Sequence, residues 1–115
     1  MLLECEQWLK NFGRERALTT LNLRLSGIYG PGRTTLLEKL KRGQVGAPTS
    51  AVHWANRIHI EDAAAAIIHL MKLENPQSTY LITDSTPLPM RTLYEALAQL
   101  VGGPVPPDSA SPTFV

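Results

Sequence analysis

The sequence predicts an α/β fold whose strands are at least partly parallel. Segments in which apolar residues alternate, as on a strand, are each followed by a segment with apolar residues at helical spacing. Their order along the chain is helix, strand, helix, strand, helix, strand, helix, which is typical of α/β domains. With 115 residues, the chain forms one domain at most.

Composition narrows the class of protein further. Hydrophobic residues make up 43% and charged residues 18%, and the net charge is +1. This predicts a globular protein without a basic stripe for nucleic acid or a polybasic segment for a membrane. No apolar run approaches the ~18 residues of a membrane span, and Glu4 and Glu6 replace the basic start of a secretion signal. The single Cys5 excludes an internal disulfide, so we expect a cytoplasmic protein.

The first elements are a helix and a strand. Helical spacing connects Leu2, Cys5, Leu9 and Phe12, with Trp8 widening the stripe, and Gly13 is placed to end the helix in a left-handed cap. In residues 19–26 the leucines alternate with polar residues, which predicts a strand. Residues 27–32 contain three glycines and a proline, so we expect a loop there.

The middle of the chain predicts a short helix, an excursion, a strand and a longer helix. Thr34 or Thr35 can cap the short helix, and Gly43 stops it. Residues 43–55 resemble a surface excursion, and residues 57–60 a strand. Asp62 is a good N-cap for a helix over residues 63–73, whose predicted buried stripe is Ala63, Ile67, Leu70 and Met71.

The last part of the chain predicts one more strand and helix. Residues 79–83 form the strand, and the helix after Pro89 has a predicted stripe of Met90, Leu93, Tyr94, Leu97, Leu100 and Val101. Four prolines follow Gly103, so residues 104–115 are expected to be a disordered tail. The predicted domain therefore covers residues 1–103.

Two segments together resemble known signatures. Residues 24–33 read RLSGIYGPGR, and residues 56–66 read NRIHIEDAAAA. They resemble the R-x-x-x-(I/V)-Y-G-P-G-R and (I/V)-H-(I/V)-x-D segments of extended and atypical short-chain dehydrogenases/reductases, the NAD-dependent epimerase/dehydratase family. The resemblance covers about residues 2–107. It implies the C-terminal portion of a Rossmann-like NAD(P)-binding fold, with the last sheet strands and a substrate-binding lobe.

The resemblance also implies site residues. Gly27, Ile28 and Tyr29 would line the nicotinamide and substrate pocket, since α/β sheets place ligands beyond the carboxyl ends of strands. Arg33 would meet an anionic substrate group, or be a solvated loop arginine. His59 would contact substrate, or be satisfied in the interior. The histidines lack the spacing of metal ligands, so no metal site is expected.

The chain lacks the motifs that carry out cofactor binding and catalysis in the family. It has neither the glycine-rich turn that binds the cofactor pyrophosphate nor the catalytic Y-x-x-x-K pair. We therefore expect no catalytic residue, no tight binding of NAD or NADP, and no activity by this chain alone, which looks shortened at both ends. Members acting on nucleotide sugars often carry Asn at the position of Gly27 and Arg near Ala55. The atypical, YeeZ-like branch is the better match.

Two other functions remain open. Residues 27–34, from Gly27 to Thr34, nearly spell a phosphate-binding P-loop between a strand and a helix, although Arg33 stands where a P-loop needs lysine. Alternatively, the chain is an orphan interaction module whose apolar faces meet a partner. That partner would be a second copy, in a homodimer, or a complementing N-terminal half.

Overall fold

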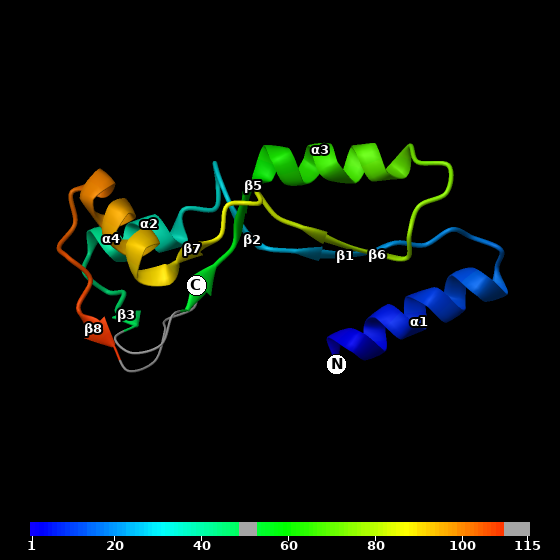
Figure 1. Ribbon diagram of the computed structural model, residues 1–115, viewed down its shortest axis with the longest axis horizontal. Helices are drawn as coiled ribbons and strands as arrows, with labels where there is room; N and C mark the ends of the chain where they lie inside the picture. Colours follow the sequence, from blue (N-terminus) through cyan, green and yellow to red (C-terminus); the bar gives the residue numbers. More distant parts are fainter. Residues whose placement is uncertain (49–52, 110–115) are drawn as a thin grey trace.

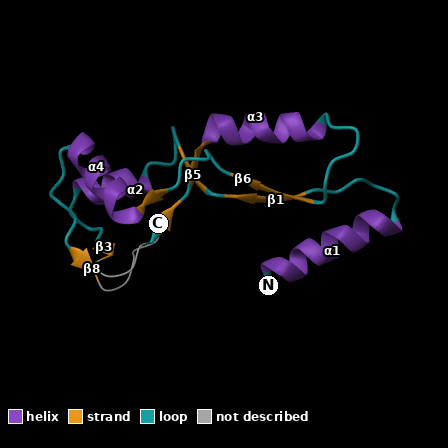
Figure 2. Cartoon of the chain, in the orientation of Figure 1, coloured by secondary structure: helices purple, strands orange, loops and turns teal. Residues whose placement is uncertain are grey.

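The chain is elongated and has two hydrophobic cores, one toward each end. The structure is a computed structural model that describes residues 1–48 and 53–109. Its principal extents are 53 × 26 × 21 Å. Figure 1 shows α1, α3 and the strands β1 and β6 at one end and α2 and α4 at the other. Short parallel strands alternate with helices along the chain (Figure 2), so the predicted α/β class is confirmed.

The first core lies between a parallel strand pair and a helix. β1 (Asn22–Leu25) pairs with β6 (Thr79–Ile82), and α3 (Ile60–Met71) covers one face of this pair. The buried core residues are Ile58, Ala63, Leu70 and Ile82. On the other face, α1 (Leu2–Glu15) is tied to β1 by the ion pair of Arg24 with Glu6, at 2.7 Å.

β1 continues almost directly into a second strand. The backbone N–H of Ser26 still donates to Ile82 of β6 (3.0 Å), whereas that of Gly27 donates to Asn56 (3.2 Å). β2 (Gly27–Tyr29) then pairs in parallel with β5 (Arg57–His59). The prediction of a loop from residue 27 is therefore wrong for these residues. β5 supplies a hydrogen-bonding partner, and the left-handed backbone begins only at Gly30, with φ of 140°.

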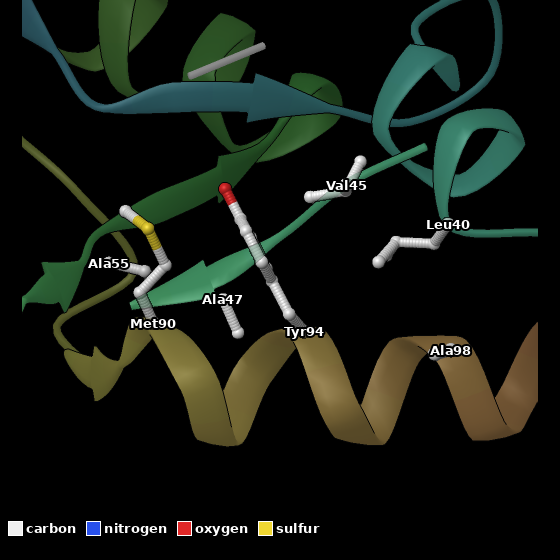
Figure 3. Close-up of a cluster of buried hydrophobic side chains, with 7 residues drawn as sticks. All are labelled: Leu40, Val45, Ala47, Ala55, Met90, Tyr94 and Ala98. Carbon is white, nitrogen blue, oxygen red and sulfur yellow. The ribbon is translucent and has the colours of Figure 1, made fainter. Parts of the chain in front are cut away.

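The second core joins α2 (Thr35–Lys41) to α4 (Met90–Val101). Figure 3 shows Leu40 of α2 facing α4, with Tyr94 projecting from α4 into the cluster. Val45 and Ala47 are also buried here, at 1% and 0% exposure. The expected surface excursion over residues 43–55 is therefore wrong for Val45, Ala47 and Ala55, which belong to this core, whereas Trp54 is exposed. Residues 49–52 lie outside the described residues.

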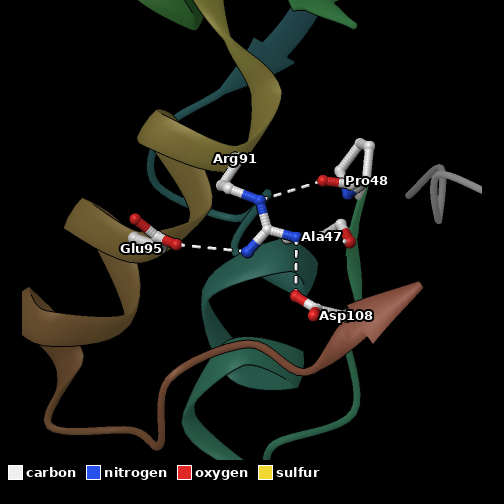
Figure 4. Close-up of polar contacts among 5 residues, drawn as sticks. All are labelled: Ala47, Pro48, Arg91, Glu95 and Asp108. Atoms are coloured by element: carbon white, nitrogen blue, oxygen red, sulfur yellow. Dashed lines mark hydrogen bonds and ion pairs between the residues drawn. The ribbon is translucent and has the colours of Figure 1, made fainter. Parts of the chain in front are cut away.

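Short strands complete this end of the chain. β3 (Ala47–Pro48) pairs in parallel with β8 (Asp108–Ser109), and β4 (Trp54–Ala55) pairs antiparallel with β7 (Leu88–Pro89). Arg91 of α4 donates to the carbonyl of Pro48 and pairs with Asp108 (Figure 4). The predicted disordered tail is therefore wrong for residues 104–109, since polar contacts and strand pairing hold them. Residues 110–115 lie outside the described part.

Helix boundaries differ from the sequence expectation at two points. α1 runs past Gly13, which is buried inside the helix and is not its cap. α3 begins at Ile60, and His59 is its N-cap in place of the predicted Asp62. Two residues of the predicted buried stripes, Met71 and Leu100, are instead 76% and 80% exposed. Across the described residues, none of the helices has both the length and the apolar composition that a membrane crossing needs.

Candidate functional site

A pocket of about 570 Å³ opens where β2 ends. It lies between the loop that follows β2, the start of α2 and one side of α4. Its wall combines a tyrosine and charged side chains with leucines: Ile28, Tyr29, Gly30, Gly32, Arg33, Thr34, Thr35, Leu36, Leu37, Arg57, Asp84, Leu93 and Leu97. The pocket therefore lies beyond the carboxyl end of a parallel strand, where α/β folds bind their ligands.

A tight turn places Arg33 on this wall. Gly30 and Arg33 form an isolated bridge in which the N–H of Arg33 donates to the carbonyl of Gly30 at 2.9 Å. The Nε of Arg33 also donates to the carbonyl of Ile28, at 3.4 Å. The turn folds the arginine back beside β2, and Arg33 lines the pocket. Whether it binds a ligand stays a prediction.

Gly30 is required by close packing as well as by its backbone. A Cβ at this position would stand 2.7 Å from Cγ2 of Ile60 and 3.3 Å from Nε2 of His59. With φ at 140°, the residue also has a conformation that other residues rarely adopt. Gly30 thus lets the loop pass closely over the start of α3.

His59 supports the site from outside the pocket lining. Its Nδ1 accepts a hydrogen bond from the N–H of Glu61 (3.1 Å), which caps α3. The imidazole meets the ring of Tyr29 edge-on, with 5.3 Å between ring centroids. Its predicted substrate contact is untested, and the contacts observed are those of a cap and an aromatic neighbour of Tyr29.

Arg57 and Asp84 line the pocket, and the sequence reasoning missed both. The N–H of Asp84 donates to the carbonyl of Arg57 (3.0 Å), which joins β5 to the segment after β6. Asp84 itself accepts from the N–H of Thr86 at 2.9 Å. One signal for Arg57 was available in the sequence. It alternates with Ile58 on a short strand, so it faces away from the core that buries Ile58.

Gly27 lies opposite Arg57 in the β2–β5 register. It is not among the residues that line the pocket, in contrast to Ile28 and Tyr29. A Cβ on Gly27 would stand 2.7 Å from Nη1 of Arg57. Of the three residues predicted for the nicotinamide pocket, two therefore border the cavity directly, and the third makes room for the arginine.

Tyr94 connects this arginine to the second core. Its side chain is 0% exposed, and Arg57 lies close to its hydroxyl. Burial raises the pKa of Tyr94 above its usual value, and the charge of Arg57 opposes that rise. The phenol therefore stays neutral and fixes one side of the guanidinium.

Parallel strands with a pocket beyond their carboxyl ends define an α/β fold of the Rossmann type. Solved structures give the relationship in more detail. An NAD-dependent epimerase/dehydratase from Methylobacillus flagellatus is 33% identical, with a TM-score of 0.67, and the match covers 96% of this chain and 38% of that one. The UDP-N-acetylglucosamine 4-epimerase of Bacillus cereus is 19% identical, with a TM-score of 0.74 and coverage of 96% and 41%.

A third match is the Bordetella bronchiseptica enzyme WbmG, solved in complex with NAD and UDP. It is 18% identical, with a TM-score of 0.61, and covers 79% of this chain and 32% of that one. No protein-family model and no curated protein matches the chain. The chain thus resembles the C-terminal part of an extended short-chain dehydrogenase/reductase of the NAD-dependent epimerase/dehydratase family. It spans about 40% of the length of these solved relatives.

Two other expectations can be compared with this geometry. The P-loop alternative is not favoured, because Gly27–Tyr29 is a strand paired with β5 and cannot wrap around a phosphate. Among the residues that the structure describes, no three His, Cys, Asp or Glu side chains gather as metal ligands would.

Proposed function

We propose that the chain forms the substrate-side wall of an NAD(P)-dependent oxidoreductase, epimerase or dehydratase. The pocket at the end of β2 carries this proposal, since Ile28, Tyr29 and Arg33 meet there as the family resemblance implies. Tyr29 and Ile28 would lie against the nicotinamide ring and the substrate, and Arg33 would bind an anionic substrate group. His59 would act through Tyr29, whose ring it contacts.

The residues present fit the nicotinamide end of the cofactor only. Ile28 and Tyr29 offer an apolar and aromatic surface suited to a flat ring. A pyrophosphate needs a glycine-rich turn ahead of a helix, whereas β1 leads straight into β2. When bound, the nicotinamide would supply hydride transfer. In this proposal the chain orients substrate beside that ring and has no acid/base residue of its own.

We further propose that the chain is inactive alone and works with a complementing N-terminal half in the cytoplasm. The coverage of its relatives and its exposed apolar side chains support the complementing half. Leu2, Leu3 and Trp8 of α1 are 79%, 69% and 62% exposed, which is unusual for the apolar stripe of a packed helix.

The test is complementation. The chain is mixed with the N-terminal part of the Methylobacillus flagellatus relative that the match does not cover, and the fluorescence of NADPH or NADH is followed. We expect a one-to-one complex that shifts the nicotinamide emission, whereas neither part alone does. A complex without any shift would contradict the proposal, and so would saturable binding of ATP with Mg²⁺ to the chain alone.

A further inference from the structure

Two arginines line one mostly apolar pocket. Arg33 reaches it from the turn after β2, and Arg57 reaches it from β5. Among the described residues of the lining, Asp84 supplies the one carboxylate, and its Oδ1 already accepts from the backbone N–H of Thr86. The charged groups of the lining therefore sum to a positive charge. Leucines of α2 and α4 form much of the remaining wall: Leu36, Leu37, Leu93 and Leu97.

Gly27 determines where the guanidinium of Arg57 lies. The two residues are paired across β2 and β5, so their side chains project from the same face of the strand pair. Nη1 and Cδ of Arg57 lie 2.7 and 3.0 Å from the position of a Gly27 Cβ. Atoms at such distances would clash with any side chain at residue 27. The guanidinium thus fills the space that a larger residue would take.

Arg57 keeps donors for a ligand in this position. A guanidinium has five N–H donors in a flat fork, and the hydroxyl of Tyr94, which lies close to Arg57, offers a single oxygen. The buried phenol holds one side of the fork in place. A fork restrained in this way loses little freedom when it binds a carboxylate or phosphate through two hydrogen bonds.

We propose that Arg57 is a specificity-determining residue, which binds the carboxylate or phosphate of a small acid with an apolar body. This inference rests on the proposed function and names the class of its substrate. Arg33 meets the same anionic group from the turn after β2, and the leucines cover the apolar body. In this proposal residue 27 is a glycine because Arg57, opposite it on β5, makes the polar contact to the ligand and fills the space of a side chain.

The test uses three flat probes on the isolated chain, followed by NMR amide shifts. Benzoate carries a carboxylate, phenyl phosphate carries a phosphate, and benzyl alcohol is neutral. We expect saturable shifts at Gly30 and Arg33 with one or both anions and much smaller shifts with the alcohol. The stronger of the two anions identifies the head group.

Variants separate Arg57 from a general charge effect. R57M should weaken anion binding by about tenfold or more, and R57K should fall between, because it keeps the charge but loses the fork. G27A should weaken binding by displacing the guanidinium while leaving the chain folded, since the atoms it meets end a flexible side chain. R16M is the matched control, because Arg16 stacks on Phe12 of α1, and it should bind as the parent does.

Anion binding unchanged in both R57M and G27A would overturn the inference, and so would equal binding of the alcohol. The failure of the proposed function looks different. In that case the anions bind through Arg57, while the complemented protein shows no change in nicotinamide fluorescence. Conversely, a fluorescence shift without anion binding supports the proposed function and overturns this inference.

Discussion

Arg91 and Asp108 form an ion pair of 2.8 Å that ties β8 to α4. The same guanidinium donates to the carbonyls of Pro48 (2.9 Å) and Ala47 (3.2 Å), so one side chain joins β3, α4 and β8 (Figure 4). Glu95, also on α4, forms an ion pair with Arg91, with 3.3 Å between Nη1 and Oε1. Together with the pairing of β3 and β8 and the N–H of Ala47, which donates to Pro107, the ion pair places residues 107–109 against the rest of the chain.

Replacing Arg91 should therefore be worse than replacing its acidic partner. R91M removes both carbonyl contacts and the ion pair, whereas D108N leaves the carbonyl contacts in place. The side chain of Asp108 is 73% exposed, and an exposed ion pair contributes little to stability. We expect R91M to lower the Tm clearly and to speed hydrogen exchange at the amide of Ala47, which donates to Pro107. Equal effects of the two variants would contradict this assignment.

Gly13 offers a test in which the usual effect of a substitution changes sign. Alanine in place of glycine inside a helix ordinarily stabilises it by about 1 kcal/mol. Here a Cβ would stand 2.8 Å from the carbonyl oxygen of Leu18 and 2.7 Å from Cγ2 of Thr20. We expect G13A to lower the free energy of unfolding by about 1–3 kcal/mol in a urea titration. Q7A, on the exposed side of α1, is the control and should be near neutral.

This glycine also shows what sequence reasoning could and could not give for the fold. The periodicity of each helix placed it correctly to within a few residues, because the stripe reflects local geometry. The periodicity does not show the close approach of residues 18–20 to Gly13, because it is a contact between the helix and the segment that follows it. The expectation of a surface excursion over residues 43–55 failed for a similar reason. A stretch without helical or strand periodicity looks exposed, although Val45 and Ala47 pack in one cluster with residues of α4, far along the chain.

The buried leucine at the interface of α2 and α4 should be sensitive to truncation. Leu40 is 1% exposed and belongs to the second core, whereas Leu100 of α4 is 80% exposed. L40A should lower the free energy of unfolding by about 2–5 kcal/mol, through lost burial and the cavity left behind. L100A should stay within about 0.5 kcal/mol of the parent. Similar losses in the two variants would mean that the burial of this helix pair is described wrongly.

The stability of the chain should depend on pH in the alkaline range through Tyr94. Burial raises its pKa above the 10.0 of an unperturbed phenol. Below pH 10 the phenol is neutral in both folded and unfolded chains, so its contribution is fully present. As the pH rises toward the folded pKa, only the unfolded chain ionises, and stability is lost. Urea titrations above pH 10 should therefore show a falling free energy of unfolding, and the fall should be smaller in Y94F.

For the site, the sequence predicted the residues that lie close together in the chain, but it missed the arginine that strand pairing brings to them. Ile28, Tyr29 and Arg33 are close in the chain, and the glycine-rich turn shows where they converge. Arg57 joins them only because β5 pairs with β2, so that its guanidinium lies over Gly27. A strand register cannot be read from two short segments with little alternation.

The last prediction concerns the face of the β1–β6 pair that α1 covers only in part. Leu81 of β6 is 76% exposed on this face, since it pairs with Arg24, which is tied to α1. Trp8 of α1 is 62% exposed. A strand pair this small is marginal alone, so we expect the chain to associate as its concentration rises. The double variant W8E/L81E should shift sedimentation toward the monomer. L100E, at a similarly exposed leucine of α4, should not, because α4 lies at the other end of the chain, away from the β1–β6 pair.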